Sequence, residues 1–469
     1  MIAPALHPQP IRAACSPRGR LAFGLTGRTI ALLGAGLILA LPGFFRASLG
    51  LGMLAWDAVV LLAALWDGLR LPAPQAIVAE RSWSNTPSLD SETEIELAIE
   101  QSSATILECS LVDDLPDALV AAPSTLALRV FPRVRTALRY RIQPRERGEA
   151  SAGSLFVRYA SPLGLVERWA QSPLQETVRV YPAIRQGEDQ QIFLARSRKI
   201  DLQLRQMRQR GLGRDFESLR EYLAGDDLRD VCWTATARSG QLITRRYQTE
   251  RSQAVWIVLD AGRLLRARTT LKAGADDQSQ IAHSKLDYAC STAVAMAQLA
   301  LYSGDRVGLL VYGQNIQQRV LPGRGAAHLR QIIEALAMAR AESSEADHLR
   351  ATATLNRLQP RRSLILWITD LAETAMRPEV VDGALQLLRR HLLLFVAMAQ
   401  PDVEAIAAAR PNNVAEMFRA SAAQELTGRR ELLLARLRER GALTLDLDPA
   451  SLTSAVLNQY LKVKERAMV

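Results

Sequence analysis

Cysteine, histidine and aromatic residues are scarce in this chain. Its 469 residues include four cysteines, five histidines and 5% aromatic side chains. The cysteines are far apart and form no Cys-x-x-Cys pair, which excludes a zinc ribbon and a disulfide framework and indicates reduced thiols in a cytosolic compartment. No basic patch is interleaved with aromatic residues, so base stacking, and with it nucleic-acid binding, is not expected.

The glycine-rich loops that bind phosphates are also missing. No Gly-x-x-x-x-Gly-Lys-[Ser/Thr] sequence occurs, and no Gly-x-Gly-x-x-Gly follows an apolar strand. The chain is long, and 48% of its residues are hydrophobic. Its 58 lysines and arginines exceed its 48 aspartates and glutamates by 58 − 48 = 10. A chain of this length and composition can form two or three packed domains. Its positive charge suits anionic lipid or an acidic protein partner.

Two apolar runs, at residues 29–45 and 47–69, fill most of residues 29–70. A bilayer span needs about 20 apolar residues, so the pattern predicts two transmembrane helices. Residues 1–28 contain four arginines and no acid. By the positive-inside rule this basic N-terminal tail, and everything after the second helix, lies in the cytoplasm.

Asp57 lies near the middle of the second run, where a carboxylate is costly. We expect it to be either protonated or paired within the helical hairpin. A cleaved signal peptide followed by a buried helix is the less favoured alternative for this region, because no small-residue cleavage site is followed by soluble sequence.

Residues 76–185 alternate apolar and polar side chains in short runs, for example Glu-Ile-Glu-Leu-Ala-Ile-Glu at residues 94–100. This period of two is typical of half-buried strands. Turn sequences separate the runs, and several short strands at this spacing predict a β-sandwich-like middle domain. Histidine is absent here and the acids are scattered, so we expect the domain to act as a spacer or a partner contact.

Residues 195–250 form a basic linker followed by a charged segment. The linker, residues 195–220, holds eight basic residues against three acids. It is either a solvated amphipathic helix or a surface for anionic lipid headgroups.

In the charged segment we expect Asp215 to cap a short helix, because apolar residues follow it at the spacing i, i+3 and i+7. Those residues are Phe216, Leu219 and Leu223. A turn at Asp226 and Asp227 follows, Asp227 caps a second short helix, and residues 241–247 form an edge strand. The segment serves as a structural lock or as a partner-docking surface, through arginine–carboxylate pairs and an aromatic cover. The residues concerned are Arg220, Tyr222, Asp226, Asp227, Arg229, Trp233 and Arg238.

Residues 251–469 alternate continuous apolar strands with helical patterns, which predicts an α/β domain with a parallel sheet covered on both faces. Strands are expected at residues 254–260, 306–313, 363–370 and 392–399, and a packed amphipathic helix at residues 429–440. Ligands of such sheets bind at the carboxyl ends of the strands. Asp260 and Asp370 both occupy such ends.

These two aspartates give the domain a resemblance to von Willebrand factor A domains, which bind Mg²⁺ through an Asp-x-Ser-x-Ser loop, a distant Thr and a further Asp. Here the loop begins at Asp260, but its serine positions hold Gly262 and Leu264, and residues 323–331 offer no Thr. A hard cation needs several oxygen ligands. The resemblance therefore implies a retained fold with a degenerate metal site at Asp260 and Asp370, and without a bound metal.

The charged segment also resembles the signature of the DUF58 family, Gly-x-Gly-x-[Asp/Glu]-Phe-x-x-Leu-Arg-x-Tyr-x-x-Gly-Asp-x-x-Arg and the residues that follow it. The matching residues are Gly211, Gly213, Phe216, Leu219, Arg220, Tyr222, Gly225, Asp226, Arg229, Trp233, Ala237, Arg238 and Glu250. The resemblance implies a membrane-anchored protein without established enzymatic activity. Such proteins are typically encoded beside a MoxR-type AAA+ ATPase and are thought to act with it in assembling or activating other proteins.

We therefore expect a non-enzymatic interaction module of the inner (plasma) membrane, with its soluble domains in the cytoplasm. Its expected partners are the lipid bilayer and a MoxR-type AAA+ ATPase, and neither nucleic acid, a small-molecule substrate nor a cofactor is expected. One alternative is a metal-dependent hydrolase that uses Asp226, Asp227 or Asp370. Another is a binder of anionic lipid or nucleic acid that works through the basic linker. The linker arginines concerned are Arg205, Arg208 and Arg210.

Overall fold

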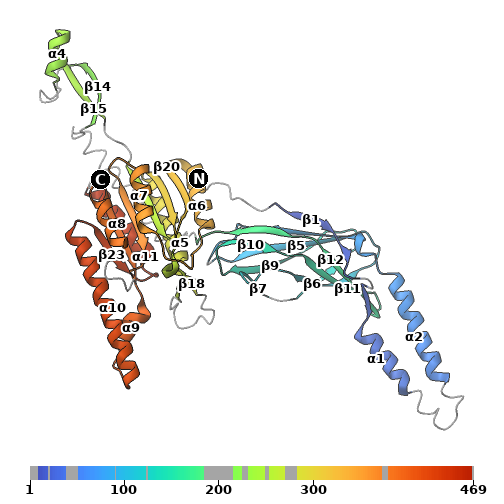
Figure 1. Cartoon of the computed structure of the whole chain (residues 1–469). Helices are drawn as coiled ribbons and strands as arrows, with labels where there is room; N and C mark the ends of the chain where they lie inside the picture. Colours follow the sequence, from blue (N-terminus) through green and yellow to red (C-terminus); the bar gives the residue numbers. More distant parts are fainter. Residues whose placement is uncertain are drawn as a thin grey trace. The chain divides into compact units, whose positions relative to one another are not determined.

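The computed structural model describes residues 9–19, 22–38, 51–89, 91–122, 125–183, 215–223, 231–248, 253–269, 282–371 and 379–466. The chain divides into two compact units, residues 1–183 and 184–469. Each unit combines helices with several β-sheets (Figure 1). The chain is therefore multi-domain, as its length and patterning predict.

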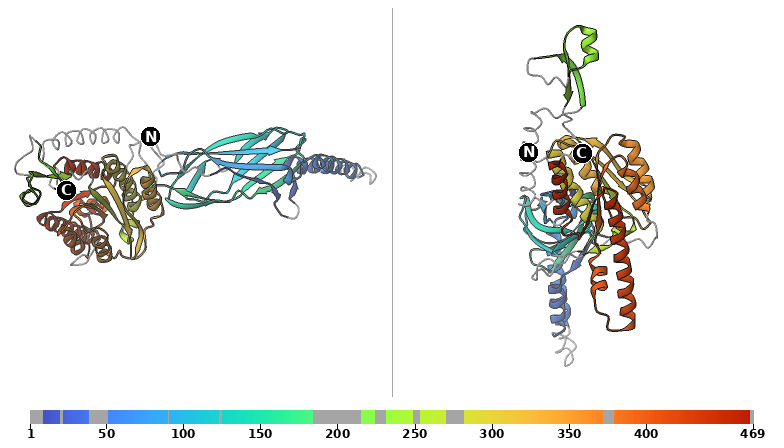
Figure 2. Two further views of the ribbon diagram at one scale, coloured as in Figure 1. Left: turned by 90° about the horizontal axis from the view of Figure 1, so that it is seen from above. Right: turned by 90° about the vertical axis from the view of Figure 1, so that its left-hand side faces the viewer.

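The first unit contains a β domain with two large sheets. One has the strand order β1-β4-β5-β9-β7, and the other has the order β2-β12-β11-β6-β8 with β3 paired to β12. The apolar side chains on their inner faces form one continuous core, and the sheets lie face to face (Figure 2). The strands are β1 (Ile11–Ala14), β2 (Ser16–Pro17), β3 (Phe23–Leu25), β4 (Ile77–Trp83), β5 (Thr93–Gln101), β6 (Leu107–Asp113), β7 (Leu119–Ala122), β8 (Leu126–Val130), β9 (Thr136–Pro144), β10 (Gly148–Ala152), β11 (Leu155–Ala160), β12 (Val166–Ser172) and β13 (Glu176–Val180).

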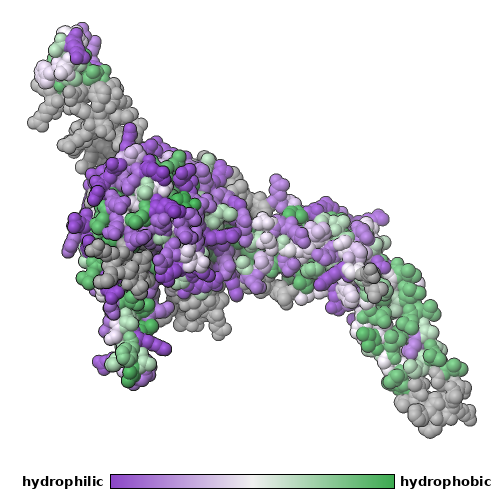
Figure 3. All heavy atoms as spheres, viewed as in Figure 1, coloured by the Kyte–Doolittle hydropathy of each residue, from purple (hydrophilic) through white to green (hydrophobic). Residues whose placement is uncertain are grey.

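Two apolar helices, α1 (Gly27–Gly36) and α2 (Leu51–Leu69), precede strand β4. Within the described residues, α2 is the one helix that is long and apolar enough to cross a membrane. Most of the visible surface of both helices is apolar (Figure 3). Residues 39–45 of the first apolar run lie outside the described residues, so two spans remain a prediction.

The two helices pack against each other. Trp56 donates from its indole nitrogen to the carbonyl oxygen of Leu32 at 2.9 Å. Asp57 lies against Gly36, where an added Cβ would come within 2.7 Å of the carboxylate. One oxygen of Asp57 is buried without a hydrogen-bond partner among the described residues, so the expected pairing within the hairpin is not seen there.

A hydrogen-bonded junction joins α2 to the β domain. The carboxylate of Asp67 is fully buried and accepts hydrogen bonds from the amides of Leu163 and Leu165, each at 3.2 Å, and from the hydroxyl of Ser161. Thr26, which precedes α1, donates to the carbonyl of Leu165 at 3.2 Å. Both helices are thereby fixed to the turn at residues 161–165.

The second unit begins with a small element that we call the signature hairpin. It consists of β14 (Asp215–Glu221), α4 (Trp233–Ser239) and β15 (Ile243–Gln248), with β14 and β15 antiparallel. The predicted helix from Asp215 is wrong, because these residues form strand β14. Pairing with β15, which is distant in the sequence, overrides the local helical spacing. The predicted edge strand is confirmed as β15.

The α/β domain is built on a six-stranded sheet with the order β20-β19-β16-β21-β22-β23. All adjacent strands are parallel except β19 and β20, which are antiparallel. The predicted strands are confirmed as β16, β19, β21 and β22, whereas the sequence patterns missed the two edge strands. The strands are β16 (Ala254–Asp260), β19 (Arg306–Tyr312), β20 (Ile316–Gly323), β21 (Leu364–Thr369), β22 (Leu392–Met398) and β23 (Leu443–Leu447), with a separate pair β17 (Arg268–Thr269) and β18 (His283–Ser284).

Helices cover both faces of this sheet. Alternate residues of β16, β19, β21 and β22 point into two apolar cores, one shared with α5, α6 and α11 and the other with α7, α8 and α10. Because helices cover both faces, neither side of an inner strand meets water, and this explains why these strands are continuous apolar runs. The helices are α5 (Lys285–Tyr302), α6 (Gly325–Met338), α7 (His348–Leu358), α8 (Glu379–Leu388), α9 (Pro401–Ala408), α10 (Val414–Glu439) and α11 (Leu452–Glu465).

Candidate functional site

The candidate site lies at the carboxyl ends of β16 and β21, the two central parallel strands. After β16 the chain adds β19 on one side, and it then returns to add β21 on the other. Ligands of open α/β sheets bind at such a reversal of strand order. Asp260 is the last residue of β16, and Asp370 directly follows β21.

Asp260 is held by two donors at the end of its strand. It accepts a hydrogen bond from the amide of Gly262 at 2.7 Å and one from the hydroxyl of Thr369, also at 2.7 Å. Burial raises the pKa of Asp260 above its ordinary value, although the neighbouring His348 and these two hydrogen bonds oppose the shift. The carboxylate is thus satisfied from within the protein.

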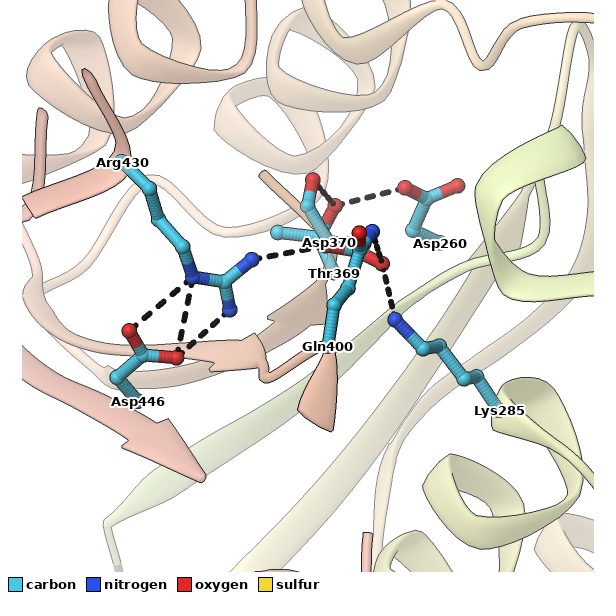
Figure 4. A network of polar contacts seen from close by, with 7 residues as sticks. All are labelled: Asp260, Lys285, Thr369, Asp370, Gln400, Arg430 and Asp446. Carbon is cyan, nitrogen blue, oxygen red and sulfur yellow. Dashed lines mark hydrogen bonds and ion pairs between the residues drawn. The ribbon is translucent and has the colours of Figure 1, made fainter. Parts of the chain in front are cut away.

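Asp370 is clamped between two cations (Figure 4). The ammonium of Lys285, the first residue of α5, lies 2.6 Å from one carboxylate oxygen, and the guanidinium of Arg430 in α10 lies 3.0 Å from the other. The amide of Gln400 also donates to Asp370 at 3.1 Å. Asp370, Lys285 and Arg430 are buried, which makes the two ion pairs stronger than they would be in water.

Arg430 extends the network to the edge strand. Its guanidinium contacts both oxygens of Asp446 in β23, at distances from 2.7 to 3.2 Å. Burial by itself lowers the pKa of Arg430, but its hydrogen bonds with Asp446 and Asp370 and the charges of both acids raise it above the ordinary value. Arg430 therefore stays charged and ties α10 to two strands at once.

The loop after Asp260 explains why serines are absent from it. A Cβ on Gly262 would come within 2.9 Å of the backbone nitrogen of Ala346, so even a serine does not fit without a shift. Leu264, at the second serine position, packs against the core beside α5. Both positions serve packing, and neither carries a hydroxyl that could bind a cation.

The arrangement favours ion pairing over metal binding. Within the described residues, no group of three or more His, Cys, Asp or Glu side chains is placed to hold a metal ion. Lys285 and Arg430 supply positive charge to both oxygens of Asp370, as a bound cation would.

Sequence reasoning found Asp260 and Asp370 but missed their partners, which are Lys285, Thr369, Gln400, Arg430 and Asp446. One signal could have found Lys285. Ser284 and Asp287 form a capping box at the start of α5, which places the lysine in the first helical turn. A cation is unfavourable there because the N-terminus of a helix carries partial positive charge. A lysine at that position, before an apolar helix, indicates a nearby acid.

The predicted residues of the charged segment divide between the signature hairpin and a part outside the described residues. Arg220 lies in β14, where its guanidinium donates to the carbonyl oxygen of Glu221 at 3.3 Å. The amide of Tyr222 donates to the carbonyl of Leu242 at 2.8 Å. Trp233 opens α4 and Arg238 lies in its last turn.

Asp226, Asp227 and Arg229 lie outside the described residues, as do residues 195–214 of the basic linker. The predicted helix of the linker is wrong for residues 215–220, because these lie in strand β14. The N-cap position of α4 is held by Cys232, whose side chain makes no capping hydrogen bond. The expected cover of an apolar side by Trp233 is wrong, because this side chain is 65% exposed.

These features define the class of the protein. It is a multi-domain chain that has an apolar helix near its start and a charged segment before a largely parallel α/β sheet. Residues 218–410 match the family model described as "Protein of unknown function DUF58". This segment, which includes Trp233, Asp260 and Asp370, is similar to the DUF58 family.

Two uncharacterized proteins, from Mycobacterium bovis and Mycobacterium tuberculosis, are each 28% identical to the chain over 199 residues. The match covers 41% of this chain, and the chain spans 58% of the length of each relative.

Two solved structures are distantly similar to the chain. The conserved hypothetical protein BatB from Bacteroides thetaiotaomicron matches 45% of this chain and 98% of its own, with a TM-score of 0.28 and 15% identity. The PilB minor pilin from Streptococcus sanguinis matches 76% of this chain and 88% of its own, with a TM-score of 0.30 and 10% identity. Scores at this level carry no argument about the fold.

Proposed function

We propose that this chain is a membrane-anchored, non-enzymatic protein-interaction module that faces the cytoplasm. Helix α2 has the length and composition of an anchor, and the arginine-rich N-terminal tail favours the cytoplasmic orientation. The α/β domain is of the von Willebrand factor A type with a degenerate metal site. This assignment is supported by the strand-end aspartates and by the packing of Gly262 and Leu264.

The observation that carries the proposal is the exposed apolar surface of the signature hairpin. Four large apolar side chains are exposed on this small element or directly beside its strands, namely Leu219, Leu223, Trp233 and Leu242. Exposed apolar clusters of this kind mark contact surfaces. Tryptophan and arginine are also the side chains that most often dominate binding energy, and Arg220 and Arg238 lie on the same element.

The proposed partner is a MoxR-type AAA+ ATPase, with which the chain acts in the assembly or activation of other proteins. Its identity is supported by the DUF58 resemblance. A hydrolase reading is less favoured, because Asp370 is already paired with Lys285 and Arg430.

Co-purification tests the proposal. Full-length protein is extracted from its host membrane in mild detergent, and bound AAA+ ATPases are quantified for wild type and for the variant Leu223→Ala/Trp233→Ala. The matched control is Leu432→Ala on α10, since Leu432 is 72% exposed and lies in the same unit.

The expected result is that wild type and the control retain the ATPase, whereas the signature variant loses it without a change in melting temperature. Equal recovery with all three proteins would show that the hairpin is not the docking surface. If no ATPase accompanies well-folded wild type, the proposed partner is wrong.

A further inference from the structure

One end of the β domain exposes apolar side chains of its own, in addition to those of α1 and α2. Phe23 and Leu25 on β3 are exposed, and Leu163 in the turn between β11 and β12 is 52% exposed. Exposed apolar side chains that cluster at one end of a domain indicate that something covers them.

These three residues are fixed next to the apolar helices. Strand β3 ends two residues before α1 begins. The amide of Leu163 donates to Asp67, two residues before the end of α2, at 3.2 Å. The exposed apolar surface is therefore continuous with the candidate membrane helix.

Strand register places further apolar side chains at the same end. Gln101 pairs with Ile77, the first residue of β4 after α2, and the amide of Arg133 donates to the carbonyl of Gln101 at 3.0 Å. The turn at residues 131–135 therefore lies where the chain arrives from α2. The exposed side chains of this turn and its neighbour are Ile106, Phe131 and Val134. Of the other large apolar side chains exposed on the described β domain, Trp169 packs against Gly24 of β3, and Val112 lies at the opposite end.

Charged and aromatic groups at this end have the chemistry of a membrane–water interface. The guanidinium of Arg70 stacks over the ring of Trp66, 3.5 Å from its centre. The exposed side chain of Arg28 lies over Gly164, where an added Cβ would meet it at 2.9 Å. Tryptophan prefers the headgroup level of a bilayer, and arginine can keep its charge in water while its stem lies along apolar surface.

We infer that this end of the β domain is a lipid-contacting surface that rests on the headgroup layer of an anionic phospholipid bilayer. Phe23, Leu25 and Leu163 enter the interface between headgroups and acyl chains, and Arg28 and Arg70 contact lipid phosphates. The inference rests on the proposed membrane anchoring. It adds that the β domain itself contacts the bilayer and is not joined to it by a flexible linker, because the Asp67 junction fixes the helices to the domain.

Site-specific labelling tests the inference. Leu163→Cys is labelled with an environment-sensitive fluorophore in full-length protein, which is reconstituted in vesicles of equal parts phosphatidylcholine and phosphatidylglycerol. The matched control is Val112→Cys, an exposed apolar position, 41% accessible, at the opposite end of strand β6 from Ile106. The four native cysteines are buried, and unsubstituted protein measures any labelling of them.

We expect lipids with a nitroxide near the headgroup to quench the label at position 163, and aqueous iodide to quench it several-fold less than the label at position 112. Arg28→Gln/Arg70→Gln is expected to increase iodide access to position 163 most in the anionic vesicles and less in pure phosphatidylcholine.

Three outcomes would overturn the inference. The first is equal iodide access at positions 163 and 112 in protein that floats with the vesicles and resists alkaline extraction. The chain would then be anchored in the membrane, but the β domain would not contact the lipid. Protection of position 163 that rises with the protein-to-lipid ratio would show a second copy of the chain on this surface. Failure of the protein to float with the vesicles would refute the anchoring itself.

Discussion

The ammonium of Lys285 lies 2.6 Å from the carboxylate of Asp370, and both side chains are almost completely buried. A protein cation thus balances the acid at the end of β21. Because Arg430 contacts the other oxygen, Asp370 joins α5, α10 and the sheet at one point.

Replacing Lys285 is expected to destabilise the α/β domain. Lys285→Met keeps the apolar stem but leaves one oxygen of Asp370 without its cation, and breaking a buried pair in this way costs on the order of 3 kcal/mol. Denaturant unfolding followed through the buried residues Trp256 and Trp367 measures the loss. The control is Arg263→Met, which breaks the exposed pair with Glu345 and should cost less than about 1 kcal/mol. Similar losses for both variants would contradict the role assigned to Lys285.

Divalent metals are expected to leave the stability of the α/β domain unchanged. The cations Lys285 and Arg430 already contact Asp370, and Gly262 and Leu264 bring no hydroxyls. An occupied site would raise stability by about 2.7 kcal/mol at a ligand concentration one hundred times Kd. Thermal unfolding is measured in Mg²⁺, in Mn²⁺ and after chelation. A melting temperature that rises with the metal concentration would refute the degenerate site.

The lowered pKa of His391 predicts that the protein loses stability in acid. Burial, together with the nearby charge of Arg390, lowers the pKa of His391 from 6.5 to about 4. Its Nε2 is buried and has no hydrogen-bond partner among the residues that the structure describes, while Nδ1 lies 3.0 Å from the hydroxyl of Ser363. The unfolded chain therefore binds more protons between these two pH values, so this contribution is complete above about pH 6.5 and is lost as the pH falls towards 4.

His391→Asn preserves a polar group near Ser363 and cannot titrate. We expect the unfolding free energy of wild type to fall more than that of this variant as the pH decreases from 6.5 to 4. The comparison cancels contributions from carboxyl groups common to both proteins. A difference that does not change with pH would show that His391 does not titrate in this range.

Asp67 is expected to hold the turn at residues 161–165 closed. Asp67→Ala removes the acceptor for the amides of Leu163 and Leu165 and leaves them unpaired, at a cost of about 1–3 kcal/mol each where they stay buried. Hydrogen exchange at these amides should become at least several-fold faster. Exchange in β16, in the other unit, should not change, and Glu100→Ala, which breaks the exposed pair with Arg12, should leave the turn unaffected. Unchanged exchange in the turn would exclude the junction as its main restraint.

Sequence patterns predicted the α/β domain well, because its central strands are short continuous apolar runs and its helices have clear periodicity. They also located Asp260 and Asp370, since both directly end such runs. Strand β14 of the signature hairpin was mispredicted as a helix, because spacing of i, i+3 and i+7 over one short segment does not distinguish a helix from a strand whose pairing partner is remote.

The rest of the site could not be read from local patterns. Lys285 is 85 residues from Asp370 and Arg430 is 60 residues from it. Arg430 also stands within a run of similar arginines in a helical pattern, where nothing local distinguishes it from a solvated side chain. Only the folded sheet and helices bring these groups together.

The four charges of Lys285, Asp370, Arg430 and Asp446 cancel, two positive against two negative. Such a compact quadrupole produces little electric field beyond its own surroundings, and its buried members are poorly reached by dissolved ions. The excess of ten positive charges on the chain therefore resides elsewhere. Raising the ionic strength should therefore not weaken this ion-pair network. Any association of the protein that depends on salt will involve its other surfaces.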